Sequence, residues 1–161
     1  MDKIKLEEWK NSMNSNFLSF DGASKGNLGE AGGGGIISNP IGNIILRYAW
    51  GLGIDSNNKA KALALWQGLT QALILNLQDL IVVGDSKIII QALNQNTRVA
   101  NGQLQHVIDK INLLWRQFHS IQLFHVLRGN NTQADEEANV GARLEKGYMR
   151  LNGVIVKRRI L

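Results

Sequence analysis

The spacing of apolar residues changes partway along the chain, after about residue 55. Before that point, short apolar runs are separated by turns that contain glycine, asparagine and proline, a pattern typical of antiparallel strands. These predicted strands cover residues 16–20, 33–38 and 43–50. After that point, apolar residues recur at spacings of three and four, which indicates helices. The first predicted helix covers 58–75, and Ser56 or Asn57 can cap its start.

Short apolar runs alternate with helical patterns through the second half of the chain. The predicted order there is a strand at 79–84, helices at 86–93 and 102–118, a strand at 120–127 and a helix at 131–144. Hairpins followed by crossover units imply one mixed sheet with helices packed on it. The predicted fold class is therefore α/β, with a five-stranded sheet of three antiparallel strands and then two parallel ones.

The two ends of the chain fall outside this predicted core. Residues 1–15 are polar and predict a frayed helical turn or a linker, and the predicted domain covers 16–145. Residues 146–161 form a basic tail, in which the apolar run 154–156 can add an edge strand. The tail also holds a small basic cluster, most simply interpreted as solvated, made of Lys157, Arg158 and Arg159.

Length and composition place the chain among soluble globular proteins with a single domain. It has 161 residues, of which 44% are hydrophobic and 19% charged. The net charge of +5 is compatible with a polyanionic partner such as nucleic acid. The absence of cysteine excludes disulfides and thiolate metal sites. The charged start and the lack of long apolar runs predict an intracellular protein, cytoplasmic or nuclear, with no signal peptide and no membrane span.

Three aspartates stand at the ends of predicted elements. Asp21 follows the first strand, Asp85 follows the strand 79–84, and Asp135 begins the last helix. Each also has an interpretation without chemistry. Asp21 can be a turn residue, and Asp85 a favourable charge at a helix N-terminus. Asp135 lies three residues after Thr132 and can form a capping box. If the three carboxylates meet at one edge of the sheet, cations must offset their repulsion, and Mg²⁺ or Mn²⁺ suits such oxygen ligands.

Four sequence blocks follow one another along the chain: FDGASKGN with its following glycines, NNKAKALALWQGL, VVGDSKIIIQAL and HVLRGNNTQADEEAN. Together they resemble the ribonuclease H family, and most of all its plant and retroelement-related "reverse-transcriptase-like" branch. The resemblance covers about residues 17–144. It implies a five-stranded mixed sheet with helices. It also implies cleavage of the RNA strand of RNA–DNA hybrids, with two divalent metal ions held by four acidic residues.

Carried over by position, the resemblance makes Asp21 the first metal-binding acid, Asp85 the third and Asp135 the fourth. The family's second acid is a glutamate in the pattern N-N-x-x-E, but the asparagine pair 57–58 is followed by Lys61. A lysine removes an oxygen ligand and adds an ammonium group. We therefore expect the fold to survive, metal binding to be weakened and cleavage to be weak or lost.

Lys61 has a competing interpretation. If the helix register is shifted by one position, Lys61 points to solvent and another acid, Glu30 or Asp55, would have to supply the missing ligand. His125, at the end of the last core strand, resembles the position of a helper histidine in some members of the family. It can equally be a histidine that packs or forms a hydrogen bond.

The resemblance also implies contacts with the RNA minor groove and with phosphates. The candidate groove contacts are Gly26, Asn27, Asn57 and Asn58, for which turn formation and helix capping are the alternatives. The candidate phosphate contacts are Lys25, Lys59, Lys87 and Arg128. Leu28 stands where the family commonly has proline, and residues 98–118 lack the dense basic run with which some members hold the hybrid.

Three functions remain open from the sequence. The chain can be a hybrid-cutting ribonuclease H domain with a damaged metal site. It can be a domain that binds hybrid or structured RNA without cutting it, a pseudoenzyme. It can also be a structural or protein-interaction remnant of a retroelement polyprotein. The residue at position 61 argues against intact catalysis, whereas the three aspartates argue against complete loss of the site.

Overall fold

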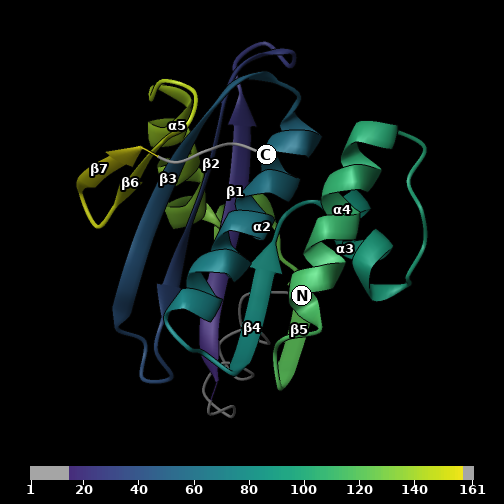
Figure 1. The fold of residues 1–161 in the computed structure, drawn as a ribbon, viewed down its shortest axis with the longest axis vertical. Coiled ribbons are helices and arrows are strands. Elements are labelled where there is room, and N and C mark those ends of the chain that lie inside the picture. Colours follow the sequence, from purple (N-terminus) through teal and green to yellow (C-terminus); the bar gives the residue numbers. More distant parts are fainter. Residues whose placement is uncertain (1–14, 158–161) are drawn as a thin grey trace.

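The computed structural model of the protein describes residues 15–157, so the predictions for 1–14 and for Arg158 and Arg159 lie outside the described residues. Within this part of the chain, one mixed sheet has the strand order β5-β4-β1-β2-β3-β6-β7 (Figure 1). The strands are β1 (Asn16–Ser24), β2 (Gly29–Ser38), β3 (Ile44–Asp55), β4 (Asp79–Gly84), β5 (Ser120–His125), β6 (Tyr148–Leu151) and β7 (Val154–Lys157).

Strand directions confirm the predicted fold class. β1, β2 and β3 pair antiparallel, whereas β4 and β5 are parallel to β1. The described sheet has two strands beyond the five-stranded core, because β6 and β7 form a C-terminal hairpin that pairs with the outer side of β3. β7 covers the run 154–156, for which the sequence suggested an edge strand. β5 ends two residues before the predicted boundary at 127.

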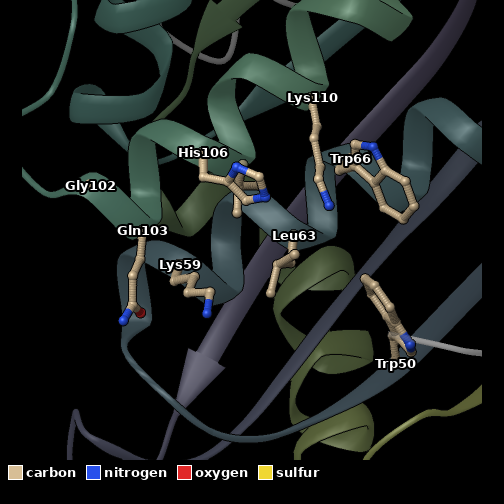
Figure 2. Close-up of a pocket in the computed structure, with 9 residues that line it drawn as sticks. Trp50, Lys59, Leu63, Trp66, Gly102, Gln103, His106 and Lys110 are labelled. Carbon is tan, nitrogen blue, oxygen red and sulfur yellow. The ribbon is translucent and has the colours of Figure 1, made fainter. Parts of the chain in front are cut away.

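Helices cover both faces of the sheet. The α-helices of the described part are α2 (Asn57–Ile74), α3 (Lys87–Asn94), α4 (Gly102–Trp115) and α5 (Thr132–Ala142). In Figure 1, α2, α3 and α4 lie on one face of the sheet and α5 on the other. Ser56 caps α2 by accepting a hydrogen bond from the Lys59 amide, as predicted. α4 and α5 are shorter at their C-terminal ends than predicted, and a pocket lies between α2 and α4 (Figure 2).

Glycines 32–35 all lie inside β2, whereas the prediction left Gly32 in the preceding turn and began the strand at residue 33. β2 begins at Gly29, four residues earlier than predicted. A Cβ added to Gly33 would press on Ala64 of α2, and one added to Gly34 would overlap the α5 backbone at Glu137. The glycines are therefore needed because helices on both faces pack against the backbone of β2. Sequence alone could not distinguish this close packing from a flexible turn.

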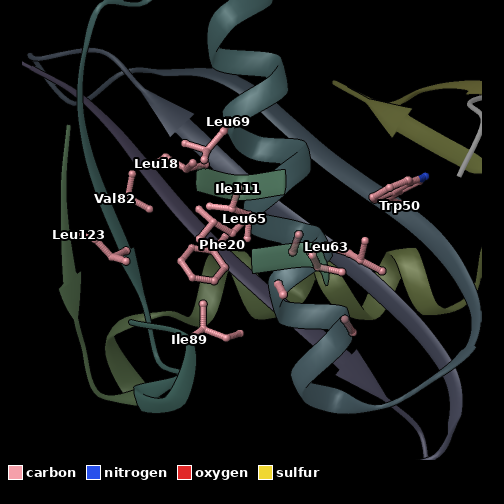
Figure 3. Close-up of a cluster of buried hydrophobic side chains, with 14 of the residues drawn as sticks. Leu18, Phe20, Trp50, Leu63, Leu65, Leu69, Val82, Ile89, Ile111 and Leu123 are labelled. Carbon is pink, nitrogen blue, oxygen red and sulfur yellow. The ribbon is translucent and has the colours of Figure 1, made fainter. Parts of the chain in front are cut away.

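The main core lies between the sheet and the helices α2, α3 and α4. Its largest fully buried side chains include Phe20 and Trp50 from the sheet, Leu65 from α2 and Ile111 from α4 (Figure 3). β1 continues four residues beyond its predicted end, so Asp21 lies within the strand rather than after it. In the described part of the chain, no helix has the length and apolar character needed to span a membrane.

Candidate functional site

Asp21 and Asp85 lie side by side on adjacent parallel strands. Ser19 of β1 is in register with Val83 of β4, and each aspartate lies two residues further along its chain. Both carboxylates are removed from solvent: Asp21 is 3% exposed, and the Asp85 side chain is 6% exposed. The predicted convergence of these two acids at one edge of the sheet is therefore what the structure has.

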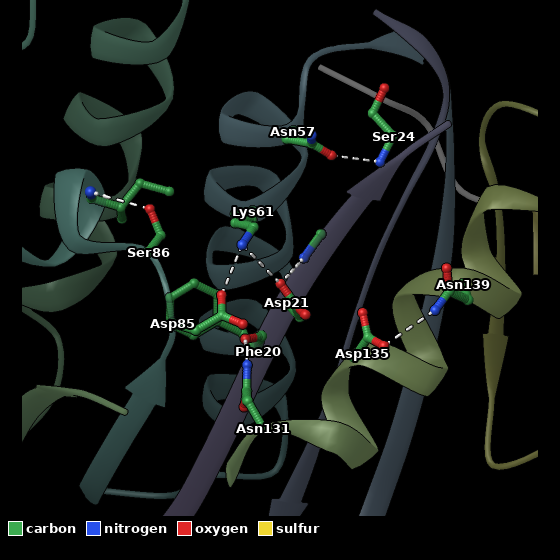
Figure 4. A network of polar contacts seen from close by, with 12 residues as sticks. Phe20, Asp21, Ser24, Asn57, Lys61, Asp85, Ser86, Asn131, Asp135 and Asn139 are labelled. Carbon is green, nitrogen blue, oxygen red and sulfur yellow. Dashed lines mark hydrogen bonds and ion pairs between the residues drawn. The ribbon is translucent and has the colours of Figure 1, made fainter. Parts of the chain in front are cut away.

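Lys61 of α2 points between the two carboxylates (Figure 4). Its Nζ lies 2.8 Å from Asp85 Oδ1, to which it donates a hydrogen bond, and 3.5 Å from Asp21 Oδ1. The helix comes this close to β1 because residue 22 is glycine, and a Cβ there would overlap the backbone of Ala60 and Lys61. The alternative in which Lys61 points to solvent is therefore wrong, because only 22% of its side chain is exposed.

Burial, followed by the negative charge of Asp85, raises the pKa of Asp21 to about 6. The Lys61 ammonium and the Gly22 amide, which donates a hydrogen bond of 2.8 Å to Asp21 Oδ1, act in the opposite direction. Burial alone would lower the pKa of Lys61. The hydrogen bond to Asp85 and the two negative charges outweigh burial, so the pKa of Lys61 lies above its ordinary value. The lysine is therefore a permanent cation between the two acids.

Asp135 lies in the first turn of α5, where its Oδ2 accepts a hydrogen bond of 3.4 Å from Asn139. It is near enough to Asp21 for its charge to raise the Asp21 pKa. The capping box predicted with Thr132 is wrong, because Asn131 is the N-cap residue and no side chain caps this helix.

Asn131 is a site residue that sequence reasoning missed. It is 2% exposed, and its Nδ2 donates a hydrogen bond of 3.0 Å to the carbonyl oxygen of Phe20, next to Asp21. This bond ties the start of α5 to β1 across 111 positions of sequence. An asparagine immediately before a helix is also the usual residue for a cap, so the sequence offered no signal that separates the two roles.

The side chains present do not fit the two-metal site that the resemblance implies. A magnesium ion requires about six oxygen ligands around one point. Asp21 and Asp85 each turn one oxygen toward the Lys61 ammonium, and Asp85 Oδ2 is buried without a hydrogen-bond partner. Among residues 15–157, no three side chains of His, Cys, Asp or Glu lie together in a way that could hold a metal ion. The lysine occupies the region where the two acids would share a cation.

Neither predicted substitute supplies the missing acid. Asp55 forms an ion pair of 3.3 Å with Lys59 and accepts a hydrogen bond from the Ser56 amide. Glu30 is exposed on β2, where its Cα pairs with Ile54 of β3. The prediction that one of them could serve as a metal ligand has no support in this arrangement.

His125 ends β5 as predicted, and its Nε2 lies 3.2 Å from the backbone oxygen of Asp85. The ring is partly buried. It therefore contacts the backbone of the segment that carries Asp85.

The glycine loop after β1 is braced against the start of α2. Asn57 Oδ1 accepts a hydrogen bond of 2.8 Å from the Ser24 amide, and Asn27 Oδ1 accepts one of 2.9 Å from the Asn57 amide. Asn27 and Gly26 both have positive φ, of 36° and 86°, as residues in a tight turn do. The turn-forming alternative therefore accounts for contacts of Asn27 and Asn57, whereas Asn58 and Lys25 are exposed.

Comparison with known proteins gives matches over most of the chain. A family model described as "Reverse transcriptase-like" matches residues 19–141. The ribonuclease HI of Halobacterium salinarum is 30% identical over 120 residues, which are 74% of this chain and 60% of that protein. A bifunctional protein of Mycobacterium tuberculosis is 31% identical over 123 residues, which are 76% of this chain and 34% of that protein. The chain thus spans about a third of the mycobacterial relative.

Solved structures agree with these matches. The crystal structure of ribonuclease H1 from Halobacterium salinarum has a TM-score of 0.76 and 28% identity, and covers 79% of this chain and 96% of that chain. A ribonuclease H1 isolated from compost, solved in complex with an RNA/DNA hybrid, has a TM-score of 0.74 and 25% identity. This match covers 80% of the present chain and 96% of the compost chain.

Proposed function

The chain belongs to the reverse transcriptase-like family and has the ribonuclease H-like fold, and we propose that it binds RNA–DNA hybrids but that Lys61 holds back cleavage of the RNA strand. The fold and the family are shared with proteins named ribonuclease HI. Their likeness to this chain supports a nuclease ancestry, and the arrangement around Asp21 and Asp85 supports the loss of cleavage.

One observation carries the loss of cleavage: the Lys61 ammonium lies between the two buried carboxylates. Two-metal hydrolysis of a phosphodiester needs one ion to activate water and another to stabilise the leaving oxygen. An ammonium group carries a single positive charge, cannot bind water as a Lewis acid, and repels any metal ion that approaches. Asp21 and Asp85 both pair with Lys61, and either carboxylate would be costly to bury without a cation.

Binding of the hybrid is supported by the surface beside these acids. A groove of about 550 Å³ lies between the starts of α2 and α4, and its walls include Asn27, Asn57, Asn58 and Lys59. Amide and ammonium groups of this kind suit sugar hydroxyls and phosphates. Lys25, Lys87 and Arg128 are exposed and available for further phosphate contacts. Leu28, at the predicted proline position, is 67% exposed at the tip of the glycine loop.

The proposal extends to the branch of the family, the metal and the location of the protein. The plant and retroelement-related branch remains a prediction, since the relatives named above come from Halobacterium and Mycobacterium. Mg²⁺ or Mn²⁺ is the expected metal for a version of this site with its fourth acid restored. An intracellular location, where RNA–DNA hybrids form, is likewise proposed.

A cleavage assay on Lys61→Glu tests the proposal. Hybrid labelled on its RNA strand is incubated with Mg²⁺ or with Mn²⁺ and with the wild type, Lys61→Glu, or Lys61→Gln. The glutamate restores an oxygen ligand, whereas the glutamine only removes the positive charge. We expect Lys61→Glu to cut the RNA strand at least about a hundredfold faster than the wild type, since a bound metal ion contributes several kcal/mol to the transition state.

Lys61→Glu combined with Asp85→Asn is the matched control, because it keeps the new glutamate but removes a partner acid. This double variant should not cut, which excludes a contaminating nuclease. Wild-type cleavage as fast as that of Lys61→Glu would refute the role of the lysine. Hybrid affinity, measured as a function of salt, tests the binding half separately. Phosphate contacts should make the affinity for hybrid fall steeply as the salt concentration rises. If the protein does not bind hybrid even at low salt, the proposed binding function is refuted.

A further inference from the structure

The pocket between α2 and α4 has an aromatic wall that the site around Asp21 does not use (Figure 2). Its volume is about 240 Å³, and its apolar lining includes Leu63 and Trp66 of α2 and Val107 of α4. The ring of Trp66 stacks on the buried ring of Trp50, with centroids 6.1 Å apart and planes inclined by 27°. Trp66 is itself only partly buried, so a face or edge of its ring is available to a flat ligand.

Two lysines and a histidine surround this aromatic wall. Lys59, His106 and Lys110 all line the pocket, and no aspartate or glutamate does. Lys59 is paired with Asp55 at 3.3 Å, but neither Lys110 nor His106 forms an ion pair with another residue in the described range 15–157. A ligand that combines a flat ring with negative charge complements both the lining and the rim.

The pocket is continuous with the groove to which we assign the hybrid. Lys59 and Gln103 line both cavities, one from the start of α2 and the other from the start of α4. A nucleic-acid strand in the groove would therefore lie next to residues that also line the aromatic pocket. The aromatic pocket, at about 240 Å³, is smaller than the range of about 300–1,000 Å³ that is usual for pockets that bind drug-sized ligands. It therefore suits a single ring system rather than a base pair.

We propose that this pocket binds one unpaired nucleobase of a strand that extends beyond the hybrid. The base stacks on Trp66, and the phosphates beside it lie against Lys110 and Lys59. Aromatic stacking beside a positive groove is a general way in which proteins bind single-stranded nucleic acid. This inference rests on the proposed binding of hybrid and adds a preference for hybrid ends or junctions that carry an unpaired strand.

The test measures the affinity of the wild-type protein for a blunt hybrid and for the same hybrid with a short unpaired extension, placed in turn on each of the four strand ends. Fluorescence anisotropy, measured in the presence of a chelator and at low salt, reports the dissociation constant of each hybrid. We expect one extension to tighten binding by about five- to a hundredfold, the usual contribution of one stacked base. In Trp66→Leu, the ratio of the affinities for extended and blunt hybrid should fall close to one, while the affinity for the blunt hybrid is retained.

Lys110→Gln is a second variant, at the pocket rim, and should reduce the gain without affecting the core. Arg116→Gln is its matched control, because it removes the same charge from the far, exposed end of α4. Equal wild-type affinity for blunt and extended hybrids, or an undiminished gain in both Trp66→Leu and Lys110→Gln, would overturn the inference and leave the proposed function standing. If the protein binds neither the blunt nor the extended hybrids, both this inference and the proposed function are overturned.

Discussion

Asp21→Asn is expected to stabilise the protein at alkaline pH, although it removes a partner of Lys61. The Asp21 carboxyl has a pKa of about 6 in the folded protein, against an ordinary value of 3.8. Folding therefore raises its proton affinity by about two pKa units, and each unit corresponds to about 1.4 kcal/mol. The buried, ionised carboxylate thus costs the folded state roughly 3 kcal/mol above pH 7.

The sign follows from proton binding. Between pH 4 and pH 6 the folded protein holds a proton on Asp21 that the unfolded chain has released, so the free energy of unfolding falls as pH rises through this window. Below pH 4 both states are protonated and the cost disappears. Asparagine is neutral throughout. The variant should therefore match the wild type near pH 4 and exceed its stability by up to about 3 kcal/mol at pH 8.

Urea unfolding of both proteins at pH 4, 6 and 8, in the presence of a chelator, measures this difference directly. Asp109→Asn is the control for the loss of one negative charge, because Asp109 is exposed and its ion pair with Arg98 is loose, at 3.9 Å. Its effect should stay within about 0.5 kcal/mol at each pH. Two results would refute this reasoning: a stability difference for Asp21→Asn that does not change with pH, or a wild type that is the more stable protein at pH 8. Either would show that burial and the charge of Asp85 do not destabilise the ionised Asp21 carboxylate.

Three further outcomes are expected. Chelation of divalent ions should leave the affinity of the wild type for hybrid unchanged in a filter-binding assay, because Lys61 already supplies the cation between Asp21 and Asp85; a tenfold loss would contradict this. Gly22→Ala should lower the free energy of unfolding by about 1–3 kcal/mol or more in urea, because the new Cβ overlaps the backbone of α2; an unchanged midpoint would show that α2 can shift. Asn131→Leu should cost about 1–3 kcal/mol in the same assay, because the Phe20 carbonyl loses a buried donor, and a neutral effect would mean that another group satisfies it.

The local pattern along the chain was enough to predict the order and type of the elements. Spacings of three and four identified α2 and α4, and Ser56 marked the start of α2 correctly. These features depend on neighbours within one or two turns, so they can be inferred from a short window of sequence. The same holds for the short strand β4, whose buried stretch is visible in the sequence as an uninterrupted apolar run.

Strand ends and the roles of glycine depended on contacts distant in sequence. Residues 29–32 were left in a turn because glycine is common in turns, but they begin a strand on which α2 and α5 both pack. The run 154–156 suggested an edge strand, but tertiary contacts decided that this strand pairs with β6 and that β6 pairs with β3. Such outcomes depend on which surfaces meet, and nothing within the local segment specifies that.

In the candidate site too, some features follow from the sequence and others only from the tertiary structure. The sequence by itself determined that an ammonium group stands at position 61 in place of a carboxylate, and that aspartates 21 and 85 follow apolar runs that can be neighbouring strands. Only the tertiary structure decided that Lys61 Nζ lies between Asp21 and Asp85, and that Asn131 ties α5 to β1. The physical reason is that charge and hydrogen-bonding capacity belong to a residue type, whereas burial and the direction of a side chain are set by the packing of elements far apart in the chain.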